Sequence, residues 1–155
     1  NGSAGIGLAL ARYLSIVPDE RYERVLSKII DAACTPFTAQ AGLFAGRAGL
    51  MYFLVEMERL GRGTPTTSAA LSTHEHWLSL HAITHGAKVR FAGDGLLRAS
   101  CDLATGSAGV LLALQSLRSK RHLPFLPLAT QPAGVPAVHS RGGERYGVLA
   151  LPSDA

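Results

Sequence analysis

The chain has 155 residues, of which 47% are hydrophobic, and a formal net charge of +4. This length suits one domain with a substantial core. Cys34 and Cys101 stand far apart without CxxC spacing, which argues against a disulfide framework or a local zinc knuckle. Because the sequence has no continuous apolar run of about 18 residues and no basic region before its first apolar stretch, we expect a cytoplasmic protein without a membrane segment.

The positive charge is scattered along the chain. Only the segment 118–122, RSKRH, is densely basic, and it lacks the interleaved aromatic residues of a single-strand nucleic-acid platform. Cations are favoured near the carbonyl-rich end of a helix, so we interpret this segment as a solvated helix end. We therefore expect no nucleic-acid partner.

A pair of glycines three residues apart, followed by an apolar helix, occurs three times. The copies begin at Gly2, Gly46 and Gly106. Glycine at this spacing, with small residues between, indicates a backbone that turns tightly and lies close to its neighbours. The pattern predicts a repeat protein in which each glycine turn starts an inner helix.

The first two repeats combine an inner and an outer helix. The residues of 3–16 are apolar on nearly all sides, which predicts a helix buried all round. Asp19 can cap an amphipathic helix over 20–33. The second repeat predicts an inner helix from the turn at 46–49 to about 60, a loop over 61–68 and an outer helix over 69–80.

An insertion precedes the third inner helix, predicted over 107–117. The second glycines are 44 residues apart between the first two copies and 60 apart between the last two. The additional residues alternate in polarity and are broken by glycines, which predicts short strands over 80–84, 88–92 and 96–99. After residue 128 the chain is rich in Pro, Gly, Ala and Ser, and we expect 129–155 to be a loosely structured tail.

Three segments resemble the lanthionine synthetase C-like family, most closely the C-terminal cyclase domain of class III lanthipeptide synthetases. They are GLFAGRAGL at 42–50, FAGDGLLRASCDLATGSAGVLLAL at 91–114 and PFLPL at 124–128. The resemblance extends over 1–128 as one domain. It implies an all-α fold, an α/α toroid, of which this chain would form an incomplete ring with three inner helices and a small β-hairpin insertion.

The resemblance also implies a function. Upstream kinase and lyase domains, which would use nucleotide and magnesium, phosphorylate Ser and Thr of a precursor peptide and eliminate phosphate. The cyclase domain then promotes the addition of cysteine thiols to the dehydroamino acids. The implied partners are the precursor peptide and the upstream domains.

Zinc-dependent members of the family have Cys-His directly before the glycine of one repeat turn and a further cysteine near the preceding turn. A thiolate-rich zinc site would lower the pKa of a bound substrate thiol. Phe44 and Ala45 align with the Cys-His pair here, and the remaining cysteine would fall before Asn1. We therefore expect no zinc, in agreement with the class III branch.

Several residues are candidates for the site. His81 and His85 flank a predicted strand at an even spacing, so both would lie on one face, and either could act as general base toward a thiol. Arg47 lies in a turn that should face the ring centre, where its guanidinium could hold an acidic leader segment or a phosphorylated side chain. A salt bridge across the ring floor is the alternative.

Charged residues along the hairpin form a second group of candidates. Arg90, Asp94 and Asp102 are candidate substrate-binding residues, but an Arg-Asp network that braces the hairpin, including Arg98, is the favoured interpretation. His74 and His76 lie two residues apart on a predicted helix and point in different directions, so we expect two surface histidines and no shared metal ion.

Two other functions remain open. The segment could be a non-catalytic module that binds peptide or supports the kinase and lyase domains. A carbohydrate-active α/α toroid is a weaker alternative, because no pair of acidic residues shares a loop as glycoside hydrolysis normally requires.

Overall fold

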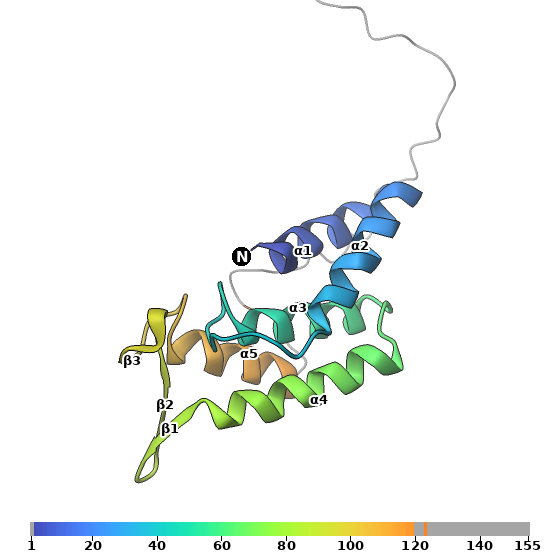
Figure 1. Ribbon diagram of the computed structural model, residues 1–155. Coiled ribbons are helices and arrows are strands. Elements are labelled where there is room, and N and C mark those ends of the chain that lie inside the picture. The colour runs from blue at the N-terminus through green and yellow to red at the C-terminus, as the bar shows by residue number, and fades with distance from the viewer. Residues whose placement is uncertain (1, 120–122, 124–155) are drawn as a thin grey trace, which may run out of the picture.

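The computed structural model describes residues 2–119 and Leu123 (Figure 1). Within them the order of elements is α1 (Ser3–Leu14), α2 (Glu20–Ala33), α3 (Arg47–Arg59), α4 (Pro65–Leu80), β1 (Ala82–His85), β2 (Lys88–Ala92), the 3-10 turn η1 (Asp94–Leu96), β3 (Ala99–Ser100) and α5 (Ser107–Ser119). The predicted all-α class with a small β insertion is confirmed. The end of the predicted domain and the predicted tail lie outside the described residues.

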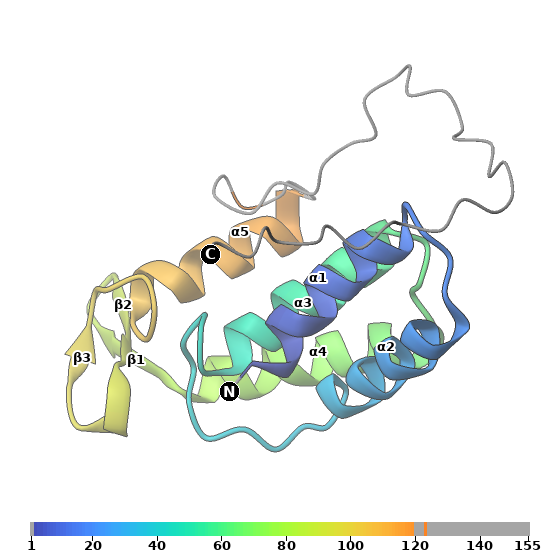
Figure 2. The same cartoon turned by 90° about the horizontal axis from the view of Figure 1, so that it is seen from above.

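Helix α3 is the centre of the fold. Its residues from Met51 to Met57 are all buried. It contacts α1 and α5, its neighbours in the predicted inner row, and also α2 and α4 of the predicted outer row (Figures 1 and 2). The alternation of inner and outer helices therefore agrees with the sequence, while the closed toroid stays a prediction.

Helix α1 is less buried than predicted. Only Gly7, Ala11 and Leu14 are buried in it, and Ile6 is 58% exposed. Among the described residues α1 packs mainly against α2 and α3, so only one side of the helix is well covered. The prediction of burial on all sides is wrong for this helix, whereas α3, which has neighbours on several sides, is buried over most of its length.

The outer helices begin at side-chain caps. Asp19 caps α2 as predicted, because its Oδ1 accepts from the backbone N–H of Arg21 at 2.9 Å. Helix α4 begins four residues earlier than predicted. The hydroxyl of Thr64 accepts from the backbone N–H of Thr67 at 3.2 Å, and the hydroxyl of Thr67 accepts from the backbone N–H of Thr64 at 2.8 Å. Pro65 occupies the first turn of the helix.

The insertion is a three-stranded antiparallel sheet in the order β1-β2-β3. Strand β2 has the predicted bounds, β1 begins two residues later than predicted, and β3 is displaced to Ala99–Ser100 because η1 occupies the preceding residues. Ser107 fastens the sheet to α5. Its hydroxyl accepts from the N–H of Phe91 at 2.9 Å and donates to the carbonyl of Ser100 at 2.8 Å.

The second and third glycine turns interlock, as the glycine pattern predicts. The N–H of Phe44 donates to the carbonyl of Ala104 at 2.9 Å. A Cβ on Gly42 would lie 2.7 Å from the Cα of Thr105, and one on Gly109 would lie 2.7 Å from the Cβ of Leu43. The two turns approach so closely that only glycine fits at these contacts.

Candidate functional site

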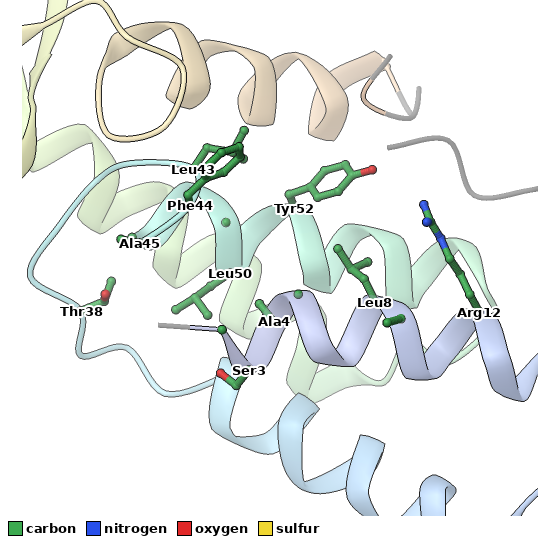
Figure 3. Close-up of a pocket in the computed structure, with 15 residues that line it drawn as sticks. Ser3, Ala4, Leu8, Arg12, Thr38, Leu43, Phe44, Ala45, Leu50 and Tyr52 are labelled. Carbon is green, nitrogen blue, oxygen red and sulfur yellow. The ribbon is translucent and has the colours of Figure 1, made fainter. Parts of the chain in front are cut away.

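A pocket of about 520 Å³ lies where the first two glycine turns meet. Its walls come from α1 along most of its length, from the loop that leads into α3 and from α3 itself (Figure 3). The residues that line it are Gly2, Ser3, Ala4, Gly5, Leu8, Ala9, Arg12, Thr38, Leu43, Phe44, Ala45, Gly46, Gly49, Leu50 and Tyr52. The turn at 46–49, which is expected to face the ring centre, thus forms part of the wall.

The pocket wall is mostly apolar, with a few polar groups. Phe44 is 60% exposed although it is large and hydrophobic. Arg12 is the one charged residue of the wall within the described part of the chain. Burial raises the pKa of Tyr52, and the neighbouring carboxylate of Glu56 raises it further. Such a pocket suits a largely apolar substrate segment with a few polar contacts.

The residues at the zinc-aligned positions do not fit a metal. Phe44 and Ala45 line the pocket, and neither side chain has an atom that can coordinate zinc. Cys34 is half-buried and Cys101 is exposed. In residues 2–119 no group of three His, Cys, Asp or Glu side chains is placed to hold an ion.

Arg47 lies in a different place from that predicted. It is only 2% exposed and does not line the pocket. Its guanidinium donates to the carbonyl of Pro36 at 3.0 Å and to that of Thr38 at 3.0 Å, and its Cζ lies 5.9 Å from the centre of the Trp77 ring. These contacts hold the loop between α2 and α3 against α4. The guanidinium is therefore buried, and it is not exposed to bind an acidic leader segment as predicted.

His74 is the partner of Arg47, and its predicted surface position is wrong. It is fully buried, with Nδ1 2.9 Å from Nη1 of Arg47 and Nε2 2.8 Å from the carbonyl oxygen of Ala33. Arginine can only donate, so Nδ1 must accept and Nε2 must donate. This arrangement requires the neutral imidazole, and burial, with a smaller contribution from Arg47, lowers the pKa of His74.

We expect the free energy of unfolding to fall as the pH drops below about 6.5. The pKa of His74 is lowered in the folded state, and its ordinary value is 6.5. Below pH 6.5 the unfolded chain therefore binds a proton at this residue, while the folded chain does not. The loss is at most about 1.4 kcal/mol per pH unit and ends below the folded pKa. Asp19 and Glu23 do not titrate between pH 5 and 6.5, because their ordinary pKa values are 3.8 and 4.5 and the folded structure lowers both.

Urea unfolding between pH 7.5 and 5 measures this dependence. His74→Asn is the matched variant, because its amide oxygen can accept from Arg47 at the place of Nδ1 but the side chain does not titrate. The variant should lose the pH slope between 6.5 and 5. An equal slope in both proteins would contradict the assignment to His74.

His81 and His85 are not brought to the pocket. His81 is the C-cap of α4 and not a strand residue. The two histidines therefore do not lie on one face of a strand, as their even spacing predicted. His85 ends β1 and is exposed. Neither residue lines the pocket between the glycine turns, and a role as general base stays a prediction for both.

The predicted Arg-Asp network does not form. Asp94 accepts from the amide of Gln40 at 3.2 Å, and Asp102 accepts from the hydroxyl of Ser100 and from the N–H of Thr105. The hydrogen bond from Ser100, followed by those from Thr105, holds the pKa of Asp102 well below its usual range. Gln40 binds the first carboxylate and polar groups of the turn before α5 bind the second, while Arg90 and Arg98 remain exposed. Substrate binding by Arg90, Asp94 and Asp102 stays a prediction.

Sequence reasoning missed Arg12 and Tyr52 of the pocket and the burial of His74. Arg12 is the one charged residue of α1, and Tyr52 is a polar interruption of the apolar run LMYFLV. His74 lies four residues after Ala70 and four before Leu78, on the buried stripe of α4. Periodicity could have placed His74 inside, because residues four apart share a helix face.

The comparisons with known proteins agree with this architecture. The family model of the lanthionine synthetase C-like proteins matches residues 1–125. The chain belongs to this family. It is also 39% identical over 132 residues to a protein described as probable SapB synthase from Streptomyces coelicolor (strain ATCC BAA-471 / A3(2) / M145). That match includes 81% of this chain and 14% of the relative.

The lanthionine synthetase C-like chain thus spans about one seventh of the length of this relative. No solved structure matches the chain. None of the helices described for this family member is long and apolar enough to cross a membrane.

Proposed function

We propose that this chain is the cyclase portion of a class III-type lanthionine synthetase. It would form thioether rings, lanthionine or labionin, in a ribosomally made precursor peptide, after upstream domains that use nucleotide and magnesium have phosphorylated Ser and Thr and eliminated the phosphate. The main support is the pocket between the glycine turns, with Phe44 and Ala45 at the positions that hold Cys-His in zinc-dependent relatives. We accordingly propose a cyclisation that does not use zinc.

The proposed reaction adds a cysteine thiol across the double bond of a dehydroamino acid. The S–C bond forms at the β-carbon, the electrons of the double bond move to an enolate, and a proton returns to the α-carbon. The product therefore has the same mass as the dehydrated peptide. The apolar walls of the pocket would hold both reacting groups together, which by itself contributes a large rate enhancement.

The enolate that develops in this addition needs positive charge nearby. Gly2 and Ser3 line the pocket at the amino end of α1, and Arg12 lines it from the last turn of the same helix. The partial positive charge of the helix amino end would favour an enolate held beside it, and the guanidinium would favour one held at the other end of the pocket.

A non-catalytic, peptide-binding module of the same synthetase is the second candidate. One observation favours it, namely that His81 and His85 do not line the pocket. The wall offers hydrogen-bond donors but no histidine to accept the thiol proton. In this case the chain would bind the peptide while rings close elsewhere or spontaneously.

We expect Ala45→Trp in the complete enzyme to slow cyclisation by about tenfold or more, because an indole at this wall displaces the reacting groups. The complete enzyme is incubated with its precursor peptide and nucleotide. Mass spectrometry follows dehydration, and alkylation counts the remaining free thiols. Ala69→Trp, on the exposed side of α4, is the matched control and should close rings at the normal rate.

Dehydration should proceed normally in both variants, so that a change in thiol count reports the cyclisation step alone. Deletion of residues 1–128 tests the catalytic role itself. Equal loss of free thiols with and without the segment would reject that role and would favour the second candidate.

A further inference from the structure

Strand β1 is an exposed edge of the sheet. The strand order is β1-β2-β3, so β1 has a neighbouring strand on one side only among the described residues. The hairpin of β1 and β2 projects from the helices (Figure 1). Natural edge strands are usually protected by lysine, proline or a bulge. The sequence of β1, AITH, has none of these, and it contains two β-branched residues that favour strand pairing.

One face of the hairpin is basic. Phe91 is buried, so Arg90 and Lys88 lie on the opposite face of β2. Their cross-strand partners on β1 are Ile83 and His85, respectively, which therefore share this face. All four residues are exposed. We call these four residues the basic face.

The charges of the basic face have no acidic partner in the described structure. Residues 2–119 contain four ion pairs, and none of them involves Lys88 or Arg90. Asp94 and Asp102, the acidic residues nearest in sequence, bind Gln40 and the turn before α5 instead. The lysine and arginine also lie two positions apart on one strand, so they repel each other without a counter-charge.

We propose that β1 and the basic face bind an extended acidic peptide segment, which adds as a further strand to the edge of the sheet. The backbone of β1 would pair with the segment, and acidic side chains at alternate positions would lie on the face of Lys88 and Arg90, across the intervening strand β1. Under the proposed function, on which this identity rests, the segment belongs to the precursor peptide.

A second copy of this chain does not fit the same edge. Antiparallel pairing of two β1 strands about a twofold axis would bring two basic faces together, and like charges at such an interface are unfavourable. A nucleic acid would be attracted by the charge, but it cannot pair with the backbone of an edge strand. Charge and the open edge together therefore favour an acidic peptide.

Fluorescence anisotropy with the complete protein tests the proposal. The probe is a fluorescein-labelled peptide of alternating threonine and glutamate. We expect the double variant Lys88→Glu and Arg90→Glu to bind it about tenfold more weakly or worse, because two attractive contacts become repulsive. Lys28→Glu makes the same kind of charge change on the exposed side of α2 and should alter binding by less than about twofold.

A second probe separates strand addition from simple charge attraction. It has proline in place of each threonine, so that it keeps the glutamates but loses backbone donors and strand geometry. We expect the proline probe to bind about tenfold more weakly than the threonine probe. Equal binding of the two probes, or equal binding by the double variant and the original protein, would overturn the proposal.

The thiol assay described above is independent of these measurements. Normal cyclisation together with unchanged probe binding by the double variant would reject the docking surface and leave the proposed function intact. Loss of probe binding in the double variant, with cyclisation unaffected by removal of residues 1–128, would support the surface and reject the catalytic role.

Discussion

Replacement of Gly109 by alanine is expected to destabilise the protein by about 3 kcal/mol or more. A Cβ at this position would lie 2.0 Å from the carbonyl oxygen of Leu103 and 2.7 Å from the Cβ of Leu43. Neither neighbour is the far end of a flexible side chain, so the backbone of the turn itself would have to move. Gly49 is in the same situation, with the carbonyl oxygen of Leu43 2.1 Å from its added Cβ.

Gly5 provides the matched control for Gly109 and Gly49. It is the second glycine of the first copy of the repeat, but its added Cβ would meet no atom within 4 Å among the described residues. Gly5→Ala should therefore stabilise α1 by about 0.5 to 1 kcal/mol, since alanine favours a helix over glycine. Urea unfolding of Gly5→Ala, Gly49→Ala and Gly109→Ala measures the three changes in the free energy of unfolding. A similar effect at Gly5 and Gly109 would show that helix propensity, and not close contact between turns, governs these positions.

Replacement of Arg47 by methionine is expected to destabilise the protein by about 3 kcal/mol. Methionine fills much of the volume but leaves the carbonyls of Pro36 and Thr38 and the Nδ1 atom of His74 without their donor. Each buried acceptor that loses its partner costs about 1 kcal/mol or more. The loop from Cys34 to Gly46 should loosen first, because these bonds fasten it to α4.

Hydrogen exchange followed by mass spectrometry measures this effect region by region. Amides of 34–46 should exchange faster in Arg47→Met, while those of α2 before Ala33 should change little. Arg47→Lys is the conservative control. It retains the positive charge but lacks the planar fork that reaches two carbonyls, so it should restore only part of the protection. Full protection in the lysine variant would show that charge alone, and not the guanidinium geometry, holds the loop.

Gly109 and Arg47 both support the wall of the same pocket, through Leu43 and Thr38 respectively. The glycine contacts set how closely the turns approach, and Arg47 holds the loop that contains Thr38, one of the lining residues. A residue that was expected to bind substrate directly thus serves to position the wall. The sequence did not predict that the carbonyls of Pro36 and Thr38 accept from Arg47, because these residues belong to a loop without regular structure.

Local signals in the sequence were sufficient for most elements. The amphipathic pattern and Asp19 predicted α2 with its observed bounds, and the alternation around Lys88–Ala92 predicted β2. Local signals were also present where the prediction failed. Thr64-Pro65 is a helix start that was assigned to a loop, and His74 lies on the buried stripe of α4. Both signals depend on few residues and are weak beside the longer periodicities.

The sequence by itself determined the family, the alternation of helices, the sheet insertion and the three glycine turns, because these depend on spacing along the chain. It also placed Phe44 and Ala45 where zinc-dependent relatives have metal ligands. Only the tertiary structure decided that Arg47 and His74 are buried together, that α1 is covered on one side, and that Arg12 and Tyr52 line the pocket. Burial and hydrogen-bond partners arise from contacts between residues distant in the chain, and one sequence contains no record of those contacts.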